Sequence, residues 1–179
     1  MPPEKPDESS EPPKPGPDAL IDTLKLTDGA GFLVRVVSSR ATAVYERLTG
    51  QAEVTPQQFG VLLTLHQRGA LTLTELAEAL YLDRSTLGEM TRRMSARGLI
   101  HRRSNGADRR STKVSIAADG EAALGRLIDG AAALQEILLA PVPPEERRQF
   151  LHHLKRVAMA IDAPSEIPGL SSAIGSRGI

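Results

Sequence analysis

The sequence of 179 residues contains no cysteine. Disulfide bonds, thiolate metal sites and thiol-based sensing of oxidants are therefore excluded for this chain. The sequence also lacks an apolar run of the roughly 20 residues that a membrane-spanning helix requires. Residues 1–17 contain no apolar segment of the kind found in secretory signals. We therefore expect a cytoplasmic protein that does not bind membranes.

Aromatic residues are scarce as well, since they make up 3% of the chain and include no Trp. Hydrophobic residues still account for 40% of the sequence, so the chain can bury a core. That core must be built mainly from Leu, Val, Ile and Ala, which suits helices that pack on helices. The length favours a single core-forming domain with extensions.

The chain has no net charge, because 22 basic residues balance 22 acidic ones. The charges are nevertheless separated along the sequence. Nine basic and three acidic residues lie between Leu82 and Lys113, so this segment carries +6 and the remainder −6. A solvated surface usually mixes both signs, and the clustering therefore favours a polyanionic partner.

Both ends of the chain are predicted to lack ordered structure. Residues 1–19 are rich in Pro, Glu, Lys and Ser, and cannot bury enough apolar surface to offset the entropy of ordering. Residues 163–179 contain Pro, Gly and Ser and are expected to be flexible. The folded domain is then expected to span residues 20–162.

Helical periodicity and capping signals predict a mainly α-helical fold with one small β-hairpin. A long first helix is expected over residues 20–48. Thr55 and Pro56 form the start signal of a second helix, whose inner face is expected to carry Phe59, Leu62, Leu63 and His66. The hairpin is expected from strands at residues 99–103 and 112–116, and the last two helices over residues 118–139 and 145–161.

Two short helices joined by a tight turn are predicted between the second helix and the hairpin. Thr72 and Glu75 have the spacing of a capping box at the start of the first of them. Asp83 can cap the second, and Gly98 suits the left-handed conformation that ends it. Buried positions in the second helix are expected at Leu87, Met90 and Met94.

The helix after Asp83 is the first candidate binding element. The second helix of a helix-turn-helix enters the major groove of DNA by its N-terminal residues. Arginine reaches guanine or phosphate, short hydroxyls near a helix N-terminus suit phosphate, and a carboxylate accepts from cytosine. We therefore predict DNA contacts by Arg84, Ser85, Thr86, Glu89 and Arg92. Taken alone, the pattern fits an ordinary amphipathic surface helix equally well.

The hairpin is the second candidate element, because its loop carries Asp108, Arg109 and Arg110. An arginine laid along a narrow minor groove meets an enhanced negative potential. Asp108 can hold the guanidinium of Arg110 in place. The alternative is a surface hairpin with an exposed ion pair, which contributes little, but its position directly after the first candidate element disfavours that interpretation.

In these motifs the sequence resembles the MarR family of winged-helix transcriptional regulators. The chain has Leu76-Ala77, the segment from Met94 to Ile100 with Arg97-Gly98-Leu99, then Asp108-Arg109-Arg110, and then the segment Ile116–Gly120. The resemblance covers roughly residues 32–161. It implies a DNA-binding lobe of about residues 55–117 in which Arg110 enters the minor groove. It leaves the base preference open, since Glu89 could orient an arginine instead of reading a base.

The resemblance also implies a homodimer that binds a palindromic operator on double-stranded DNA. Helices at about residues 20–50 and 118–162 would then form the dimerisation region. These helices carry more apolar residues than one small domain can bury, which agrees with a dimer. A monomer with a compact helical cap is the less favoured alternative.

A small-molecule effector is a further implication, and the resemblance favours regulators of aromatic-acid catabolism. The expected effector is an aromatic carboxylate or an acyl-CoA thioester, because an arginine beside an apolar pocket suits a carboxylate or phosphate. Candidate contacts are Arg35, Ser39, Arg40 and His66. Interface ion pairs for the arginines, and a partly buried structural histidine for His66, are the ordinary alternatives.

Two other function classes were weighed against a ligand-responsive repressor. A winged-helix architectural or protein-interaction module would bind without sequence-specific readout. An enzyme is disfavoured, because the sequence shows no nucleophile–base pairing and no glycine-rich phosphate loop, and no cofactor is expected. A metal site is not expected either, since the adjacent His152 and His153 diverge on a helix.

Overall fold

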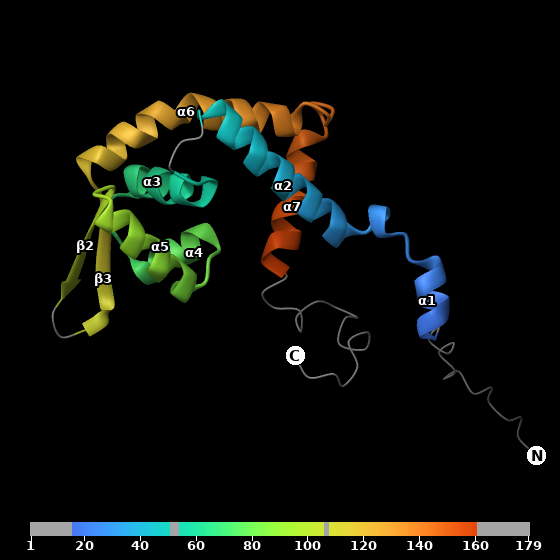
Figure 1. Ribbon diagram of the computed structural model, residues 1–179, viewed down its shortest axis with the longest axis horizontal. Coiled ribbons are helices and arrows are strands. Elements are labelled where there is room, and N and C mark those ends of the chain that lie inside the picture. The colour runs from blue at the N-terminus through green and yellow to red at the C-terminus, as the bar shows by residue number, and fades with distance from the viewer. Residues whose placement is uncertain (1–15, 51–53, 106–107, 161–179) are drawn as a thin grey trace, which may run out of the picture. The chain divides into compact units, whose positions relative to one another are not determined.

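The computed structural model describes residues 16–50, 54–105 and 108–160 (Figure 1). The chain divides into two compact units, residues 1–40 and residues 41–179, and each is described by itself. Helix α2 contains the boundary between them. The two predicted tails lie mostly outside the described residues.

The single long helix expected over residues 20–48 is not observed. The segment forms α1 (Pro17–Thr23), a 3-10 turn η1 (Leu26–Asp28) and α2 (Ala30–Leu48). Backbone angles at Lys25 and Gly29 are extended on either side of η1. Gly29 and Gly31 are poor helix formers, and the preceding Asp28 competes with helical hydrogen bonding, so the helix breaks here. Helix α1 also begins inside the segment predicted as a disordered tail.

The second unit contains the predicted helix-turn-helix lobe, and its start signals are confirmed. Helix α3 (Pro56–Arg68) opens with a capping box between Thr55 and Gln58. Helix α4 (Leu73–Leu80) opens with the predicted box between Thr72 and Glu75. Hydrogen bonds from the Thr72 backbone and hydroxyl keep the pKa of the Glu75 carboxyl below its usual value. Helix α5 (Arg84–Ala96) is capped by Asp83 as expected.

A three-stranded antiparallel sheet with the order β1-β3-β2 completes this lobe. Strands β2 (Ile100–Asn105) and β3 (Asp108–Ile116) form the predicted hairpin, and both extend further toward the turn than the sequence indicated. Strand β1 (Leu71–Thr72) was not predicted, because two residues are too short to show an alternating pattern. It pairs with Val114 and Lys113 of β3 and thereby ties the start of α4 to the hairpin.

The core of the second unit is aliphatic, as the composition predicts. It joins α3, α4, α5, the sheet and the first half of α6 (Ala118–Leu139). Its largest fully buried side chains are Leu62, Leu65, Leu76, Leu87, Met94 and Ile100. Burial of this kind contributes roughly 1.5–3 kcal/mol for each large aliphatic side chain. Helix α5 is therefore held by its apolar side, which leaves its polar side for other contacts.

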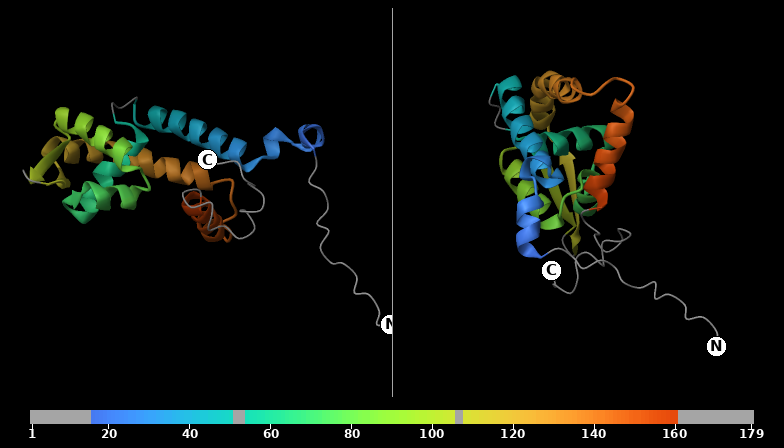
Figure 2. Two further views of the ribbon diagram at one scale, coloured as in Figure 1. Left: turned by 90° about the horizontal axis from the view of Figure 1, so that it is seen from below. Right: turned by 90° about the vertical axis from the view of Figure 1, so that its right-hand side faces the viewer.

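Helix α6 runs along α3 on the far side from the hairpin tip, as Figures 1 and 2 show. The start of α6 lies close against the backbone of Leu99, which precedes β2, because Gly120 has no side chain. A Cβ at this position would lie 2.1 Å from the carbonyl oxygen of Leu99.

The last helix, α7 (Arg147–Ala160), contains no buried residue. No helix among the described residues is long and apolar enough to cross a membrane.

Candidate DNA-binding surface

Helix α5 is fixed at both ends by local hydrogen bonds. At its N-terminus, Asp83 Oδ1 accepts the Thr86 backbone N–H at 2.8 Å. At its C-terminus, Gly98 has a φ of 75°, and the N–H groups of Gly98 and Leu99 donate to the carbonyls of Ser95 and Met94 at 3.0 Å. This pair of bonds is a Schellman motif, which requires the left-handed residue that the sequence predicted at Gly98.

The predicted contact residues Arg84, Ser85 and Thr86 are all exposed at the N-terminal turn of α5. The Ser85 hydroxyl donates to Asp83 Oδ1 at 2.5 Å. Hydrogen bonds from Ser85 and then Thr86 hold the pKa of the Asp83 carboxyl far below its usual range. The cap is therefore ionised at neutral pH and engages the Thr86 backbone N–H and the Ser85 hydroxyl, so the exposed Arg84 is the charged group of this turn that a phosphate would meet.

Glu89 binds arginines of its own helix. Its carboxylate accepts a hydrogen bond from Arg92 Nη1 and another from Arg93 Nη1, the latter at 3.3 Å. All three side chains are about half exposed or more. This arrangement agrees with the alternative in which Glu89 orients an arginine, and it leaves less of the carboxylate available to a cytosine amino group.

The predicted wing residues Asp108, Arg109 and Arg110 occupy the first three positions of β3. Asp108 pairs with Asn105 of β2, and the register shifts between Arg103 and Asn105. The side chains of Asp108, Arg109 and Arg110 lie outside what the structure describes. The backbone places these residues at the tip of the hairpin, and Figure 1 shows that hairpin beside α5.

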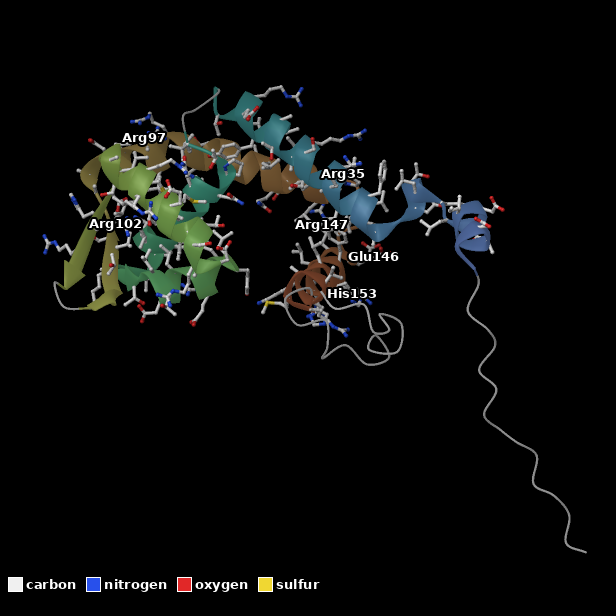
Figure 3. The ribbon with its side chains drawn as sticks, turned by 60° about the horizontal axis from the view of Figure 1, so that its bottom comes forward. Arg35, Arg97, Arg102, Glu146, Arg147 and His153 are labelled. Carbon is white, nitrogen blue, oxygen red and sulfur yellow. The ribbon has the colours of Figure 1, made fainter. Side chains whose placement is uncertain are left out.

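Arg102 on β2 is a further basic residue beside α5 that the sequence did not single out (Figure 3). Its Nε atom is buried and has no hydrogen-bond partner. Burial, and then the nearby charge of Arg92, lower the pKa of its guanidinium. Figure 3 labels Arg102 where β2 adjoins α5. The alternation of β2 could have revealed it, because Arg102 shares a face with the buried Ile100.

The predicted effector contacts fall in different units. Arg35, Ser39 and Arg40 are exposed on the part of α2 that belongs to the first unit. The guanidinium of Arg35, labelled in Figure 3, lies over the Phe32 ring, 5.3 Å from its centroid. Such a contact is a cation–π interaction and keeps the charge at the surface.

His66 does not lie on the inner face of α3 as expected. Its side chain is 54% exposed, and its Nδ1 lies 2.8 Å from Glu121 Oε2 on α6. The inner face is formed by Gln58, Val61, Leu62 and Leu65. The error came from the helical phase, since His66 follows Leu65 by 100° and falls just outside the buried stripe.

Two features near α2 and α6 were not foreseen. Tyr45 is only 2% exposed, and its hydroxyl is buried without a hydrogen-bond partner. Burial raises the pKa of this hydroxyl, and the ring meets the edge of Phe59 at 6.2 Å between centroids.

The second feature is a cavity of about 490 Å³. It is lined by Thr49, Val54, Arg97, Leu99, Asp119, Ala122, Ala123, Arg126 and Leu127. None of the predicted effector residues lines it.

Comparisons with known proteins match this architecture. The sequence model of the MarR family matches residues 54–112, which run from the start of α3 into the hairpin. The organic hydroperoxide resistance transcriptional regulator of Bacillus subtilis is 34% identical over 109 residues, which cover 61% of this chain and 74% of that protein.

Two solved structures share the fold. Bordetella bronchiseptica BpsR, described with regulation of its DNA binding by 6-hydroxynicotinic acid, superposes with a TM-score of 0.68 at 25% identity. The match covers 75% of this chain and 96% of BpsR. The transcriptional repressor CouR bound to a 23-mer DNA duplex superposes with a TM-score of 0.64 at 27% identity. That match covers 75% of this chain and 98% of CouR.

Proposed function

The chain belongs to the MarR family, and from this premise we propose that it is a homodimeric repressor. The dimer binds a palindromic operator, and a small aromatic acid or the CoA thioester of such an acid releases it from that DNA. As a family member it is a DNA-binding transcriptional regulator and not an enzyme. The finer parts of the proposal concern the DNA contacts, the dimer and the effector.

One observation carries the DNA-binding part of the proposal: the N-terminal turn of α5 presents exposed polar and basic side chains beside a hairpin whose tip holds Asp108, Arg109 and Arg110. A helix in the major groove and an arginine in the adjacent minor groove together read more of a site than either element alone. The +6 segment that contains both elements supplies the attraction to phosphate.

Exposed apolar side chains support the homodimer. Phe150, Leu151, Leu154 and Val157 of α7 are each 43–49% exposed. Contiguous apolar surface of this kind on a small protein marks an interface. A two-fold dimer places two recognition helices about one DNA turn apart, which matches a palindromic operator. An effector that favours another spacing would shift the population away from DNA.

The effector part of the proposal rests on arginines beside apolar surface. Arg35, Ser39 and Arg40 on α2 and His66 on α3 remain the proposed contacts, the first three in the first unit and His66 in the second. The regulation of BpsR by 6-hydroxynicotinic acid supports an aromatic acid as the class of ligand. A thiol of this chain cannot sense hydroperoxides, because the sequence has no cysteine.

The proposal is tested by selecting a binding site from random duplex DNA with the wild-type protein. We expect one palindromic sequence, bound at fixed salt far more weakly by Arg84→Ala and Arg110→Ala than by the wild type. Aromatic acids and their CoA thioesters are then screened for a rise in Tm and for release of this DNA. Recovery of random sequences only would instead indicate an architectural module without sequence readout.

The same screen distinguishes an effector bound by the α2 arginines from one bound in the cavity that Arg126 lines. A ligand held by the α2 arginines should lose its effect on the Tm in Arg35→Ala and keep it in Arg126→Ala, whose side chain lines the separate cavity. The opposite pattern would place the effector in that cavity and overturn the proposed contacts on α2.

A further inference from the structure

Gly88 lies in the middle of recognition helix α5, four residues after Arg84 and four before Arg92. Side chains four residues apart share one side of a helix, so Gly88 stands between these two arginines. The buried stripe of the helix is formed by its neighbours Leu87, Met90, Thr91 and Met94, all at most 4% exposed. Gly88 is only partly buried and lies at the margin of that stripe.

The fold does not require glycine at this position. A Cβ built on Gly88 would meet no atom within 4 Å. Its φ is not in the left-handed region, where Gly50, Gly69 and Gly98 are found. Glycine within a helix is less stable than alanine because it orders a more flexible backbone. An alanine would therefore fit the protein and stabilise it. A requirement for glycine at this position would have to come from a partner that contacts the outer side of the helix.

Gly88 offers an approaching base pair only its Cα methylene group. Its peptide groups belong to the helix, and its carbonyl also accepts the Thr91 hydroxyl at 3.1 Å. The neighbouring Glu89 carboxylate is engaged by Arg92 and Arg93. Among the features that base pairs present in the major groove, the C5-methyl group of thymine is the one read by apolar contact instead of hydrogen bonding.

We propose that Gly88 is a specificity-determining residue that admits the C5-methyl group of one thymine in each operator half-site against the backbone of α5. The inference rests on the proposed function as an operator-binding repressor. It predicts that the absence of a side chain between Arg84 and Arg92 contributes to operator affinity, since any side chain there would occupy the space of the methyl group.

The test combines Gly88→Ala with replacement of thymine by uracil, which removes only the methyl group. Operator DNA selected by the wild-type protein is scanned with uracil at each symmetric pair of thymines. For the wild type, one such pair should weaken binding roughly fourfold per half-site, the value of one buried methylene-sized group. Gly88→Ala should bind the thymine operator no more tightly than the wild type binds the uracil operator. Replacement of that thymine pair by uracil should not weaken the binding of Gly88→Ala further.

Gly125→Ala is the matched control, because Gly125 also lies within a helix and its Cβ would also meet no atom within 4 Å. Both variants should raise the Tm, by roughly 2–4 °C each, and only Gly88→Ala should lose operator affinity. Equal uracil effects in wild type and Gly88→Ala, or unchanged operator affinity of Gly88→Ala, would overturn the role of Gly88 alone. Failure of the wild type to select any operator would overturn the proposed function and this inference with it.

Discussion

Glu89 binds Arg92 one turn further along α5, and its second carboxylate oxygen binds Arg93. The recognition helix thus carries a carboxylate that restrains two of its own arginines. Exposed ion pairs of this kind add little to stability. Their consequence is for DNA binding, because each arginine held by Glu89 is less available to phosphate.

Replacing Glu89 by Gln should therefore raise affinity for random DNA and reduce discrimination. Removal of one negative charge and release of two guanidinium groups should steepen the dependence of log Kobs on log salt by about 1–2. Fluorescence anisotropy with a random duplex at several salt concentrations measures this slope. Glu78→Gln, an exposed position on α4, removes the same charge outside α5 and should change the slope less. Equal slopes in the two variants would contradict the role given to Glu89.

The Asp83 cap should make the stability of the lobe depend on pH. The pKa of Asp83 is lowered in the folded state, so its stabilising contribution is complete above the unfolded value near 4 and is lost as pH falls through the folded value. Asp83→Ala should lower the Tm by roughly 2–4 °C at pH 7. Thermal unfolding measured from pH 7 down to pH 2 should show this difference shrinking below about pH 4. A difference that stays constant to pH 2 would show that the ionised cap is not its source.

Gly120 should tolerate no side chain. A Cβ there would lie 2.1 Å from the Leu99 carbonyl oxygen and 2.9 Å from Ile116 Cγ1, so backbone must move. We expect Gly120→Ala to lower the free energy of unfolding by roughly 1–3 kcal/mol or more. Chemical denaturation measures this loss, and Gly125→Ala on the same helix should show none. Wild-type stability of Gly120→Ala would mean that α6 does not pack this closely on the lobe.

The helix starts were predictable from sequence because each is a local signal. The boxes of Thr55 with Gln58 and of Thr72 with Glu75 are set within one turn. The failures have other causes. The two-residue strand β1 depends on pairing with Val114 and Lys113 far along the chain. The break at Gly29 is the sum of several weak preferences, and the helical periodicity that predicts the first helix lies after it, in residues 32–48.

The residues of the candidate DNA-binding surface likewise fall into those that local sequence signals predict and those that depend on tertiary packing. Arg84, Ser85 and Thr86 follow directly from the Asp83 cap, so their exposure on the first turn of α5 was predictable. The restraint of Arg92 and Arg93 by Glu89 could be anticipated from their spacing of three and four residues. The side of β2 on which Arg102 lies follows from the alternation of the strand. The lack of a partner for its Nε and for the Tyr45 hydroxyl could not be anticipated, because both depend on how separate elements pack.

A polar substitution on the apolar side of α7 should dissociate the proposed dimer. Leu154 lies at the centre of the exposed side chains Phe150, Leu151 and Val157. Leu154→Asp should shift the sedimentation coefficient to that of a monomer and abolish binding to a palindromic operator. Arg156→Glu lies on the opposite side of the helix by its spacing and should leave the dimer intact. A wild-type protein that sediments as a monomer at micromolar concentration would refute the dimer.

The most direct test of the central claim, sequence-specific DNA binding by α5 and the hairpin, is the ratio of affinities for the selected operator and for a random duplex as salt rises. Electrostatic contacts alone lose affinity for both duplexes together, whereas base contacts are kept. We predict that the wild type keeps a preference of at least about 10³-fold from 50 to 200 mM salt, and that Arg84→Ala and Arg110→Ala reduce it. A ratio near one at every salt concentration would contradict the account.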